Sequence, residues 1–460
     1  MPFDPSLFRA YDIRGIYPSV IHEDFAYVCA QSFVKVMDAK VVLVGRDVRV
    51  SGESMQKAAI QGLLDMGVKI IDLGVISTEM LYFASGYLEG VDGGFVCTAS
   101  HNPREWNGFK FVGKAGQPLT REDKLGEIYD EIKKEQRVRV DTPGTVEKID
   151  LCDAYAEYLK RYVPENVPDL KIVGNVNFGA NGRFVDAALQ HLPSVSVVRL
   201  NWEPDGTFPK GTPDPLLPSN RKEITARIQA ENADFGVAWD ADADRCFFYD
   251  EKGRAIPGYY INALLIEHFL AIEPGASFVI EPRQLWATEA TAADNGGTTV
   301  ISRTGHGFIK AKMRESGAIF GGENSGHFYY RDFWKCDNGI ITFLTVLDVF
   351  AKKIAAGGKV SEILDDWRAR YPASEEINFV TDKAAEIIEG LKGRHADATL
   401  STIDGVSPDA GDWRCNLRMS QNEPVLRLNV EAKTPEGLAV HEKDLVGYIE
   451  SFGAKIRDDH

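Results

Sequence analysis

The strongest constraint on the fold is a repeated alternation of short apolar segments with longer amphipathic ones. The segment 40–47 (KVVLVGRD) indicates a buried strand, and the residues after Ser51 place apolar side chains at helical spacing. The same strand–helix–strand cycle returns at 171–201 and again at 277–304. Strands separated by helices of this length predict an α/β fold with parallel sheets, built from three related units.

Shifts in composition divide these cycles from one another. The segment 140–148 (VDTPGTVEK) is typical of a linker, and turn residues at 250–258 and 369–376 mark two further breaks. The C-terminal part differs, because a strand at 377–381 and a helix near 383–394 precede an apparent hairpin. We therefore predict three α/β domains and a smaller α+β domain, with the boundaries 1–150, 151–252, 253–368 and 369–460.

Charge and cysteine usage restrict the class of protein. The formal net charge of −16 argues against nucleic acid as a partner, although a local basic pocket can still hold a small anion. The six cysteines lie far apart without a C-x-x-C pair, which favours a reducing compartment. The longest apolar stretch, 340–351, is interrupted by Asp348 and is too short to cross a bilayer, and no signal peptide is visible. We expect a cytoplasmic protein without a membrane partner, either a monomer or a homodimer.

The stretch 93–111 (GGFVCTASHNPREWNGFKF) indicates a buried strand that delivers Ser100 to a polar turn. A serine hydroxyl attacks or carries a phosphoryl group only if other groups manage its proton and its charge. His101 and Lys110 are candidates for that task. Taken alone, the motif is equally compatible with Ser100 as a helix cap. A serine hydrolase is disfavoured because no G-x-S-x-G motif is present.

The stretch 238–251 (AWDADADRCFFYDE) sets Asp240, Asp242 and Asp244 at alternate positions after an apolar strand. Carboxylates so close together repel one another unless a cation lies between them, and such oxygen ligands suit Mg²⁺ or Ca²⁺. An EF-hand is excluded because Arg245 stands where that loop requires glycine. The pattern favours a metal site over a solvated acidic turn, and Arg245 is placed to bind a phosphate as well.

A third loop, GGENSGHFYYRD, contains Glu323, Ser325 and His327 at alternate positions. An extended backbone would direct all three side chains to one side, where mixed donors and acceptors suit neighbouring sugar hydroxyls. His306, in RTGHG, is a candidate for the same pocket. Glycine-rich polar loops are common, so this motif is weak on its own.

The fourth loop, RMSQNEP, offers Arg418, Ser420 and Asn422 together with backbone N–H groups. These donors make a plausible phosphate cradle. The alternative is an ordinary β-hairpin turn with a solvated arginine.

Two N-terminal segments add further donors. The first, FRAYDIRG, contains Tyr11 and Arg14, and the second, GRDVRVSG, contains Arg46 and Arg49. We expect one of these arginines to form a structural ion pair.

In this order and spacing, the four loops together resemble the motifs of the α-D-phosphohexomutase family, in its phosphomannomutase/phosphoglucomutase branch. The resemblance runs from Phe8 to about residue 432. It implies four domains around a central cleft, the first three with related mixed α/β sheet cores. It also implies an isomerase that interconverts mannose 6-phosphate and mannose 1-phosphate, and glucose phosphates as well, through a phosphoserine and a hexose 1,6-bisphosphate.

The resemblance assigns a role to each motif. Ser100 would be the phosphoserine and, with the three aspartates, a ligand of one Mg²⁺ per chain; a hexose 1,6-bisphosphate would be the activator. Arg245 would support the phosphoserine region. Candidates for proton handling are Arg14, His101, Lys110 and His306. The implied substrate-binding residues are Tyr11, Arg14, Glu323, Ser325, His327, Arg418, Ser420 and Asn422.

The sequence departs from the family pattern at Ala241 and Ala243, where glycine is usual in at least one position. Methyl groups there restrict the backbone of the aspartate loop. Three alternatives remain open: a phosphoglucosamine mutase, a metal-dependent sugar phosphatase on the same site, and a sugar-phosphate sensor without turnover.

Overall fold

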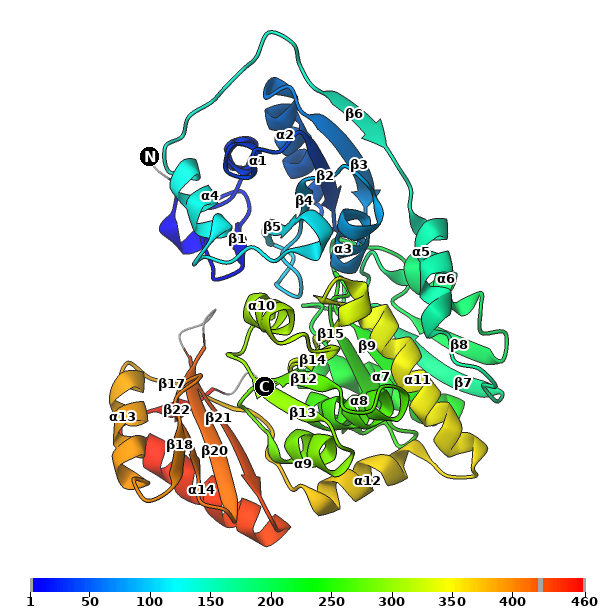
Figure 1. Ribbon diagram of the computed structural model, residues 1–460, viewed down its shortest axis with the longest axis vertical. Helices are drawn as coiled ribbons and strands as arrows, with labels where there is room; N and C mark the ends of the chain where they lie inside the picture. Colours follow the sequence, from blue (N-terminus) through cyan, green and yellow to red (C-terminus); the bar gives the residue numbers. More distant parts are fainter. Residues whose placement is uncertain (1–2, 421–424, 458–460) are drawn as a thin grey trace.

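The computed structural model describes residues 3–420 and 425–457. Its strands form four separate sheets. In Figure 1 the colours run from blue to red along the chain and so distinguish the four domains that contain these sheets. Domain I lies at the top of that view, domains II and III lie below it, and domain IV stands beside domain III. The predicted four-domain fold, three α/β domains and a smaller α+β domain, is confirmed.

Domain I contains a six-stranded sheet in the order β1-β5-β4-β2-β3-β6. Strand β2 pairs in parallel with β3 and β4, whereas β5 runs antiparallel to β4 and β1. The loop between β4 and β5, residues 98–105, contains Ser100 and is called the serine loop below. The chain returns directly after it as β5, so the sheet is mixed and not purely parallel. Its elements are β1 (Asp12–Ile16), α1 (Glu23–Met37), β2 (Val41–Arg46), α2 (Gly52–Asp65), β3 (Lys69–Val75), α3 (Thr78–Tyr87), β4 (Gly93–Cys97), β5 (Trp106–Gly113), α4 (Lys124–Ile132) and β6 (Thr145–Lys148).

The expected linker at 140–148 is only partly a linker. Its second half forms β6, which pairs in parallel with β3 at the edge of the first sheet. Backbone bonds from Val140 N to Asp65 O and from Gly144 N to Leu64 O, both 2.8 Å, hold the preceding turn against α2. The prediction was wrong for this half because the proline and the glycine of a turn, Pro143 and Gly144, were read as a domain break, although a short strand follows them.

Domain II has a five-stranded sheet in the order β11-β10-β9-β7-β8. Strand β7 pairs in parallel with β8 and β9, and the hairpin strand β10 returns antiparallel to β9. Its elements are α5 (Cys152–Leu159), β7 (Leu170–Asn175), α6 (Gly182–Leu189), β8 (Val195–Leu200), α7 (Pro218–Glu231), β9 (Phe235–Trp239), β10 (Cys246–Tyr249) and β11 (Ala255–Ile256).

Domain III repeats this plan with a five-stranded sheet in the order β13-β12-β14-β15-β16. Strand β12 pairs in parallel with β13 and β14, and β15 runs antiparallel to β14. Its elements are α8 (Gly258–Ile272), β12 (Ser277–Ile280), α9 (Trp286–Asp294), β13 (Thr298–Ile301), α10 (His306–Ser316), β14 (Phe320–Gly322), β15 (Phe328–Tyr330), β16 (Cys336–Asp337), α11 (Gly339–Ala355) and α12 (Val360–Arg370).

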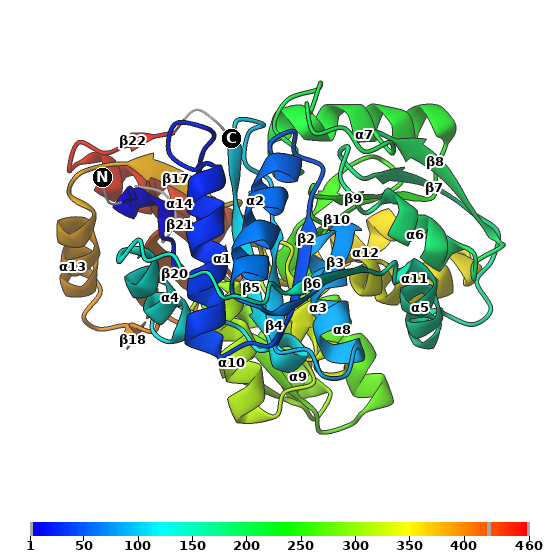
Figure 2. The ribbon, with the colours of Figure 1, turned by 90° about the horizontal axis from the view of Figure 1, so that it is seen from above.

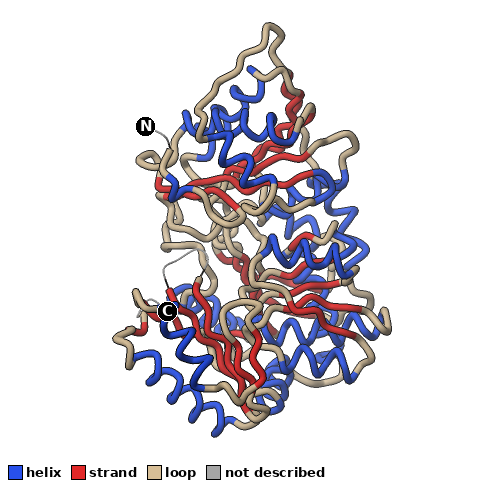
Figure 3. The backbone as a smooth tube through the Cα atoms, turned by 60° about the vertical axis from the view of Figure 1, so that its left-hand side comes forward, coloured by secondary structure: helices blue, strands red, loops and turns tan. Residues whose placement is uncertain are grey.

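Domain IV consists of a six-stranded sheet, every described pair of which is antiparallel, and two helices. The predicted hairpin is β20 and β21, with Arg418 opposite Arg427 in the register. Figure 3 shows helices along one face of this sheet. Its elements are β17 (Ile377–Val380), α13 (Ala384–Arg394), β18 (Thr399–Ser401), β19 (Ser407–Asp409), β20 (Trp413–Met419), β21 (Val425–Ala432), α14 (Pro435–Glu450) and β22 (Lys455–Ile456).

Two central strands, β4 and β9, position the candidate site. All five residues of each strand are buried, as expected for strands covered on both faces. Neighbouring strands approach closely at Gly94, where a Cβ atom would lie 2.1 Å from the Leu43 carbonyl oxygen. Both strands end at polar loops, one carrying Ser100 and the other Asp240, so the apolar cores fix where these loops begin.

The apolar core joins domains I, II and III but not domain IV. One buried cluster contains Leu43 of domain I, Phe235 of domain II and Phe343 of domain III. Domain IV has a separate cluster around Leu417 and Leu428. Burying apolar side chains against one another is the main source of stability, so the first three domains form one body to which the fourth is attached.

Domain IV is attached through a buried carboxylate. Glu431, fully buried, accepts hydrogen bonds from the backbone N–H groups of Leu285, at 2.8 Å, and Trp286, at 3.1 Å, where α9 begins. Arg414 and the Tyr259 hydroxyl bind the same carboxylate. A carboxylate at a helix N-terminus is stabilised by the free N–H groups and the helix dipole. The fourth domain thus caps a helix of the third. No helix among the described residues is both long and apolar enough to cross a membrane.

Candidate active site

Ser100 follows β4 in a turn and not at the start of a helix, so the helix-cap interpretation is wrong. Its backbone has φ +51° and its N–H donates to Thr98 Oγ1 at 2.9 Å. The Ser100 hydroxyl lies 3.2 Å from Asp240 Oδ2 and 3.2 Å from His101 Nδ1. A left-handed conformation is uncommon outside glycine, and here it turns the hydroxyl toward the aspartate loop of domain II.

Arg49 holds the serine loop in place. Its guanidinium is buried, pairs with Asp47 at 3.1 Å, and donates to four backbone carbonyls between residues 100 and 106 at 2.6–2.9 Å. The Asp47 carboxylate in turn accepts from Thr98 Oγ1 at 2.7 Å. Arg49 is thus the structural arginine that the sequence led us to expect. Its planar fork of donors explains how one side chain orders an irregular turn.

The three aspartates converge as predicted. Asp240, Asp242 and Asp244 are buried, and one oxygen from each lies within 4.8 Å of the others. Asp242 Oδ1 accepts no hydrogen bond in the described part of the chain, and Asp244 Oδ1 has only an ion pair with His327 at 3.5 Å. Ala243 has φ +57°, a conformation that favours glycine, so the alanine noted in the sequence adopts a strained backbone. Buried, unsatisfied carboxylate oxygens at this spacing fit a divalent cation.

Lys110 places an ammonium group against these carboxylates. It lies on β5, with Nζ 2.7 Å from Asp242 Oδ2, and it also contacts Asp244. Burial lowers the pKa of Lys110, but the Asp242 and Asp244 carboxylates outweigh it and raise that pKa above its ordinary value. Thr78, at the start of α3, donates to the same Asp242 oxygen at 2.7 Å. Domain I therefore supplies both a cation and a hydroxyl to the aspartate loop of domain II.

The aspartates differ in their titration. Burial raises the pKa of Asp240 to about 7, against the attraction of Arg245, whose Nε donates to Asp240 Oδ2 at 2.8 Å. Burial acts on Asp244 as well, but Lys110 and His327 hold its pKa well below the ordinary value. A divalent cation would favour the charged form of every carboxylate that it contacts. Arg245 Nη2 is buried without a hydrogen-bond partner among the described residues, as expected of a donor that awaits an anion.

His101 stands at the edge of this cluster. Burial and the nearby cations Arg245, Arg14 and Lys110 lower the pKa of His101 well below its ordinary value, so the ring is neutral at pH 7. Asp214 carries a carboxylate 3.9 Å from His101 Nε2 and 3.9 Å from Arg245 Nη1. No sequence motif marked Asp214, because it lies in a long loop and not directly after a strand.

The third loop, residues 321–332, is called the sugar loop below. The sequence led us to expect an extended backbone here, but the loop folds into a tight turn. Gly326, with φ +90°, donates to the Glu323 carbonyl at 3.1 Å, and Glu323 N–H donates to the His327 carbonyl at 2.9 Å. The three predicted side chains still meet, since His327 Nδ1 lies 3.2 Å from Ser325 Oγ and 3.6 Å from Glu323 Oε2. The prediction that the three side chains meet was correct, but the cause is different. Gly326 allows a turn that brings them together, whereas we had expected an extended backbone.

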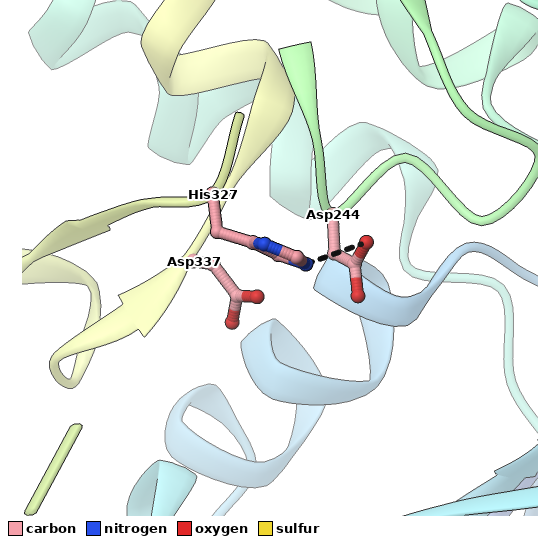
Figure 4. A group of neighbouring side chains, drawn as sticks. All are labelled: Asp244, His327 and Asp337. Carbon is pink, nitrogen blue, oxygen red and sulfur yellow. Dashed lines mark ion pairs between the residues drawn. The ribbon is translucent and has the colours of Figure 1, made fainter. Parts of the chain in front are cut away.

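His327 joins the sugar loop to the aspartate loop. Figure 4 shows its ring between Asp244 and Asp337, with Nε2 3.5 Å from Asp244 Oδ1. Burial opposes protonation of this ring, but Asp244 and Glu323 raise the pKa of His327 above its ordinary value. Asp337 is held by Lys310 at 2.6 Å, and both are almost fully buried. Lys310 and Asp337 were missed because neither belongs to a recognisable motif.

Tyr11 and His306 form one of the contacts between domains I and III. The Tyr11 hydroxyl donates to the Thr304 carbonyl at 3.3 Å, and its ring lies 4.7 Å from the His306 ring. Burial, with Lys310 and Lys110 nearby, lowers the pKa of His306 well below its ordinary value. Aromatic packing of this kind fixes His306 at the N-terminus of α10, close to the sugar loop.

Arg14 lies on β1 next to the serine loop. Its guanidinium pairs with Asp12 at 2.7 Å and donates to Asn102 Oδ1 at 2.6 Å. Asn102 belongs to the same turn as Ser100, so Arg14 is placed beside the hydroxyl that the sequence singled out.

Arg418 lies at the border of domains III and IV, in a group of charged residues that we call the arginine cluster: Arg283, Arg418, Arg427, Glu281 and Glu376. Glu376 lies 3.2 Å from Arg283, 2.9 Å from Arg427 and 3.7 Å from Arg418. Burial would raise the pKa of Glu376, but Arg427, Arg283 and Arg418 lower it to about 2.

The arginine cluster was only partly predicted. Arg283 is the third residue after β12, in the loop at the carboxyl end of that strand, so the strand-end rule that selected the other loops would have found it. Ser420 closes the hairpin through its N–H, which donates to the Val425 carbonyl at 2.9 Å. Asn422, the third predicted residue of this loop, lies outside the described residues.

Comparison with known proteins agrees with this geometry. Family models described as "Phosphoglucomutase/phosphomannomutase, alpha/beta/alpha domain" I, II and III match residues 5–139, 153–253 and 257–371, respectively. The chain belongs to the phosphohexomutase family. Members of this family are isomerases, so the chain is an enzyme of that class. Its three buried aspartates are spaced to hold a metal ion.

Several relatives span almost the whole chain. A phosphomannomutase of Salmonella montevideo is 41% identical over 435 residues, covering 93% of this chain and 94% of the relative. One of Vibrio cholerae is 40% identical over 438 residues, with the same coverage of both chains. The crystal structure of a phosphoglucomutase/phosphomannomutase family protein from Burkholderia thailandensis superposes with a TM-score of 0.86 at 29% identity, covering 99% of each chain.

Proposed function

We propose that the protein is a phosphomannomutase, which interconverts mannose 6-phosphate and mannose 1-phosphate and also accepts glucose phosphates. The observation that carries the proposal is the Ser100 hydroxyl 3.2 Å from Asp240, beside three carboxylates and Lys110. Relatives named phosphomannomutase at 41% and 40% identity support mannose as the sugar.

The proposed reaction is two phosphoryl transfers with the sugar turning over between them. In the first transfer, the phosphorus–oxygen bond to Ser100 breaks, a new one forms to a sugar hydroxyl oxygen, and that hydroxyl loses its proton. In the second, the other phosphoryl group of the hexose 1,6-bisphosphate moves to Ser100 Oγ, and the sugar oxygen that it leaves regains a proton. Such transfers depend on positioning and on stabilisation of charge. A hexose 1,6-bisphosphate is therefore the proposed activator, because it phosphorylates resting Ser100.

The charged groups of domains I and II support this chemistry. Asp240, Asp242 and Asp244 would hold one Mg²⁺ together with a seryl phosphate oxygen, and the ion would neutralise the charge that develops in transfer. Lys110, kept protonated by the carboxylates, adds a positive charge at the same place. A phosphoserine adds about −1.5 to −2 charges at neutral pH. The positive charges of Mg²⁺ and Lys110 would therefore offset the negative charge of the phosphoserine.

The proton of the sugar hydroxyl needs an acceptor near Ser100. His101 Nδ1 lies 3.2 Å from Ser100 Oγ and is neutral at pH 7, which suits a general base. His306 is also neutral, on the side of the sugar loop. We propose these two rings as the proton acceptors, one on each side. Arg14 and Arg245 would bind the phosphoryl group through their guanidinium groups.

The remaining predicted residues would bind the sugar. Glu323, Ser325 and His327 form one polar group that offers donors and acceptors to adjacent hydroxyls. Arg418, Ser420 and Asn422 are proposed to bind the phosphate that does not react, with Tyr11 closing the contact between domains I and III.

A parallel assay of mannose, glucose and glucosamine 1-phosphates, with Mg²⁺ and glucose 1,6-bisphosphate present, tests the proposal. A phosphomannomutase converts mannose 1-phosphate to the 6-phosphate at the highest kcat/KM and releases almost no inorganic phosphate. Faster conversion of glucosamine 1-phosphate would make the protein a phosphoglucosamine mutase instead. Stoichiometric release of inorganic phosphate would make it a phosphatase, and binding without conversion would make it a sensor.

A further inference from the structure

A cavity apart from the Ser100 site lies in domain II, at the carboxyl ends of β7 and β8 and next to the N-terminus of α7. Figure 2 shows α7 alongside these strands, near the upper edge of the view. Its volume is about 410 Å³, within the range of small-molecule sites. The chain runs from β7 to β8 on one side of β7 and then returns past β7 to β9 on the other side. Ligands of open α/β sheets bind outside the carboxyl ends of the strands. The residues of the cavity that matter here are Asn175, Asn177, Phe178, Asn201, Lys210 and Lys222.

Two buried amides leave hydrogen-bonding atoms open to this cavity. Asn175 is 3% exposed and Asn177 is 7% exposed. Asn175 Oδ1 accepts from Asn177 N–H at 3.0 Å and Asn201 Nδ2 at 3.1 Å, and Asn177 Nδ2 donates to the Trp239 carbonyl at 2.6 Å. Asn175 Nδ2 and Asn177 Oδ1 have no such partner in the described chain. One donor and one acceptor at the wall of the cavity suit a ligand that carries hydroxyl groups.

The wall of the cavity has an unusual backbone. Asn177, Phe178 and Asn201 have φ values of +49°, +62° and +49°. Asparagine tolerates this conformation, but a bulky side chain such as phenylalanine adopts it at a cost. The result is that the half-buried Phe178 ring lines the cavity beside the amides. An aromatic face next to amides suits the apolar face of a ring that also carries hydroxyls.

The rim of the cavity is positively charged. Lys210 pairs with Glu223 at 2.5 Å, whereas Lys222 is exposed and has no ion pair with any described residue. Helix α7 begins at the cavity without a side-chain cap. Pro218 has no N–H and the Asn220 N–H donates to the Leu217 carbonyl at 3.0 Å, so the Ser219 N–H and the helix dipole remain for an anion. One uncompensated lysine and an uncapped helix end favour an anionic group at the rim.

We propose that this cavity is a second binding site, for a small phosphorylated polyhydroxy compound of the chemical class of the hexose phosphates. The amides of Asn175 and Asn177 bind its hydroxyls, Phe178 covers its apolar face, and Lys222 with the start of α7 binds its phosphate. The proposal rests on domain II alone, so it stands or falls independently of the reaction at Ser100.

The cavity is connected to the aspartate loop by two short paths. Asn177 binds the carbonyl of Trp239, the residue before Asp240. Asn220 Nδ2 donates to the Asp214 carbonyl at 2.8 Å, and the Asp214 carboxylate lies 3.9 Å from Arg245. A ligand that orders Asn177 and the 212–220 segment therefore changes the position of the aspartate loop. Occupancy of the second site is expected to shift the Mg²⁺ concentration for half-maximal binding by twofold or more.

Calorimetric titration with mannose 6-phosphate tests the proposal. We expect two classes of site in the intact protein and in Ser100→Ala, which leaves the cavity unchanged. Lys222→Glu should weaken the second class roughly tenfold, which corresponds to reversing one charge next to the phosphate. Ser219→Trp, at the exposed mouth of the cavity, should abolish that class and also the shift in Mg²⁺ binding. Arg227→Glu, on the same helix but away from the cavity, is the matched control and should change neither class.

A single class of site, or a second class that survives both Lys222→Glu and Ser219→Trp, would overturn the proposal. Inorganic phosphate and mannose, titrated separately, should each bind at least tenfold more weakly than mannose 6-phosphate. Inorganic phosphate binding as tightly as the sugar phosphate would show an anion site without recognition of hydroxyls, and the proposal would be wrong. Thermal melting of each variant confirms that it is folded.

Discussion

In the serine–metal region, Lys110 contacts Asp242 and Asp244 inside a body whose three domains share one apolar core, whereas the arginine cluster lies where that body meets the separate core of domain IV. In the first region, Lys110 of domain I holds Asp242 and Asp244 of domain II, while Arg245 pairs with Asp240 inside domain II. In the second, three arginines share the carboxylate of Glu376. The first arrangement fixes distances between reacting groups, and the second leaves donors available for an incoming anion.

This difference predicts that substitutions in the two regions affect different kinetic constants. A region held by a continuous core keeps its geometry, which phosphoryl transfer requires. A region between separately packed domains adjusts more easily when a ligand binds, because fewer apolar contacts must be broken. Substitutions in the first region should therefore lower kcat, and substitutions in the second should mainly raise KM.

The largest effect is expected for Ser100→Ala. Without the hydroxyl no phosphoserine forms, so kcat should fall on the order of 10³-fold or more. The melting temperature should stay within a few degrees, because the side chain loses only weak hydrogen bonds. Ser54→Ala, on the surface of α2, is the matched control. Mutase activity in Ser100→Ala comparable with that of the control would contradict the assignment of the nucleophile.

The next effect concerns Asp242→Asn. Removing one carboxylate charge from the metal loop should lower kcat roughly 100-fold and shift the Mg²⁺ titration to higher concentrations. Activity across a Mg²⁺ series, with the exposed Asp153→Asn as control, measures both. An unchanged Mg²⁺ titration would show that this loop does not bind the metal.

In the arginine cluster, Arg418→Ala should raise KM by roughly tenfold and change kcat by less than threefold, because the guanidinium binds a phosphate throughout the reaction. Steady-state kinetics with mannose 1-phosphate give both constants. Arg394→Ala removes a surface arginine from the same domain and should leave them unchanged. A fall in kcat without a change in KM would place Arg418 with the reacting groups and abolish the contrast between the two regions.

The smallest effect is expected for Glu376→Gln. The pKa of this carboxyl is lowered to about 2 in the folded protein, so its charged form stabilises the fold above the unfolded pKa near 4.5. That stabilisation is lost as the pH falls from about 4.5 toward 2. Because about a fifth of the Glu376 side chain is exposed, we expect its charge to contribute only about 1 kcal/mol to the free energy of unfolding.

Urea unfolding at pH 7 and at pH 3 measures the effect of Glu376→Gln. The difference in free energy of unfolding between the two pH values should be smaller in Glu376→Gln than in the unaltered protein. An identical pH dependence would show that the arginines do not hold this carboxylate in its charged form.

The sequence predicted the motifs that end strands but not the residues that support them. Ser100 and the three aspartates were found because each group is contiguous and follows an apolar strand. Asp47 and Thr78 were missed as supports because their effect depends on side chains brought together only by the fold.

The conformation of loops was harder to predict than their composition. The sugar loop turns at Gly326 although its alternation is typical of a strand, and β6 forms in a segment that is typical of a linker. Local preference in such short segments is overridden by the hydrogen bonds of neighbouring elements. The arginine cluster shows the same limit, since Glu376 and Arg427 meet Arg283 only across a domain border.

The central claim is that the Ser100 hydroxyl carries a phosphoryl group opposite the metal loop. Tandem mass spectrometry of the protein after incubation with glucose 1,6-bisphosphate tests it directly. We predict one phosphate per chain, on the peptide and at the position of Ser100, and its removal when excess mannose 1-phosphate is added with Mg²⁺. An active protein with phosphate on another residue, or with none at any stage of turnover, would contradict the account.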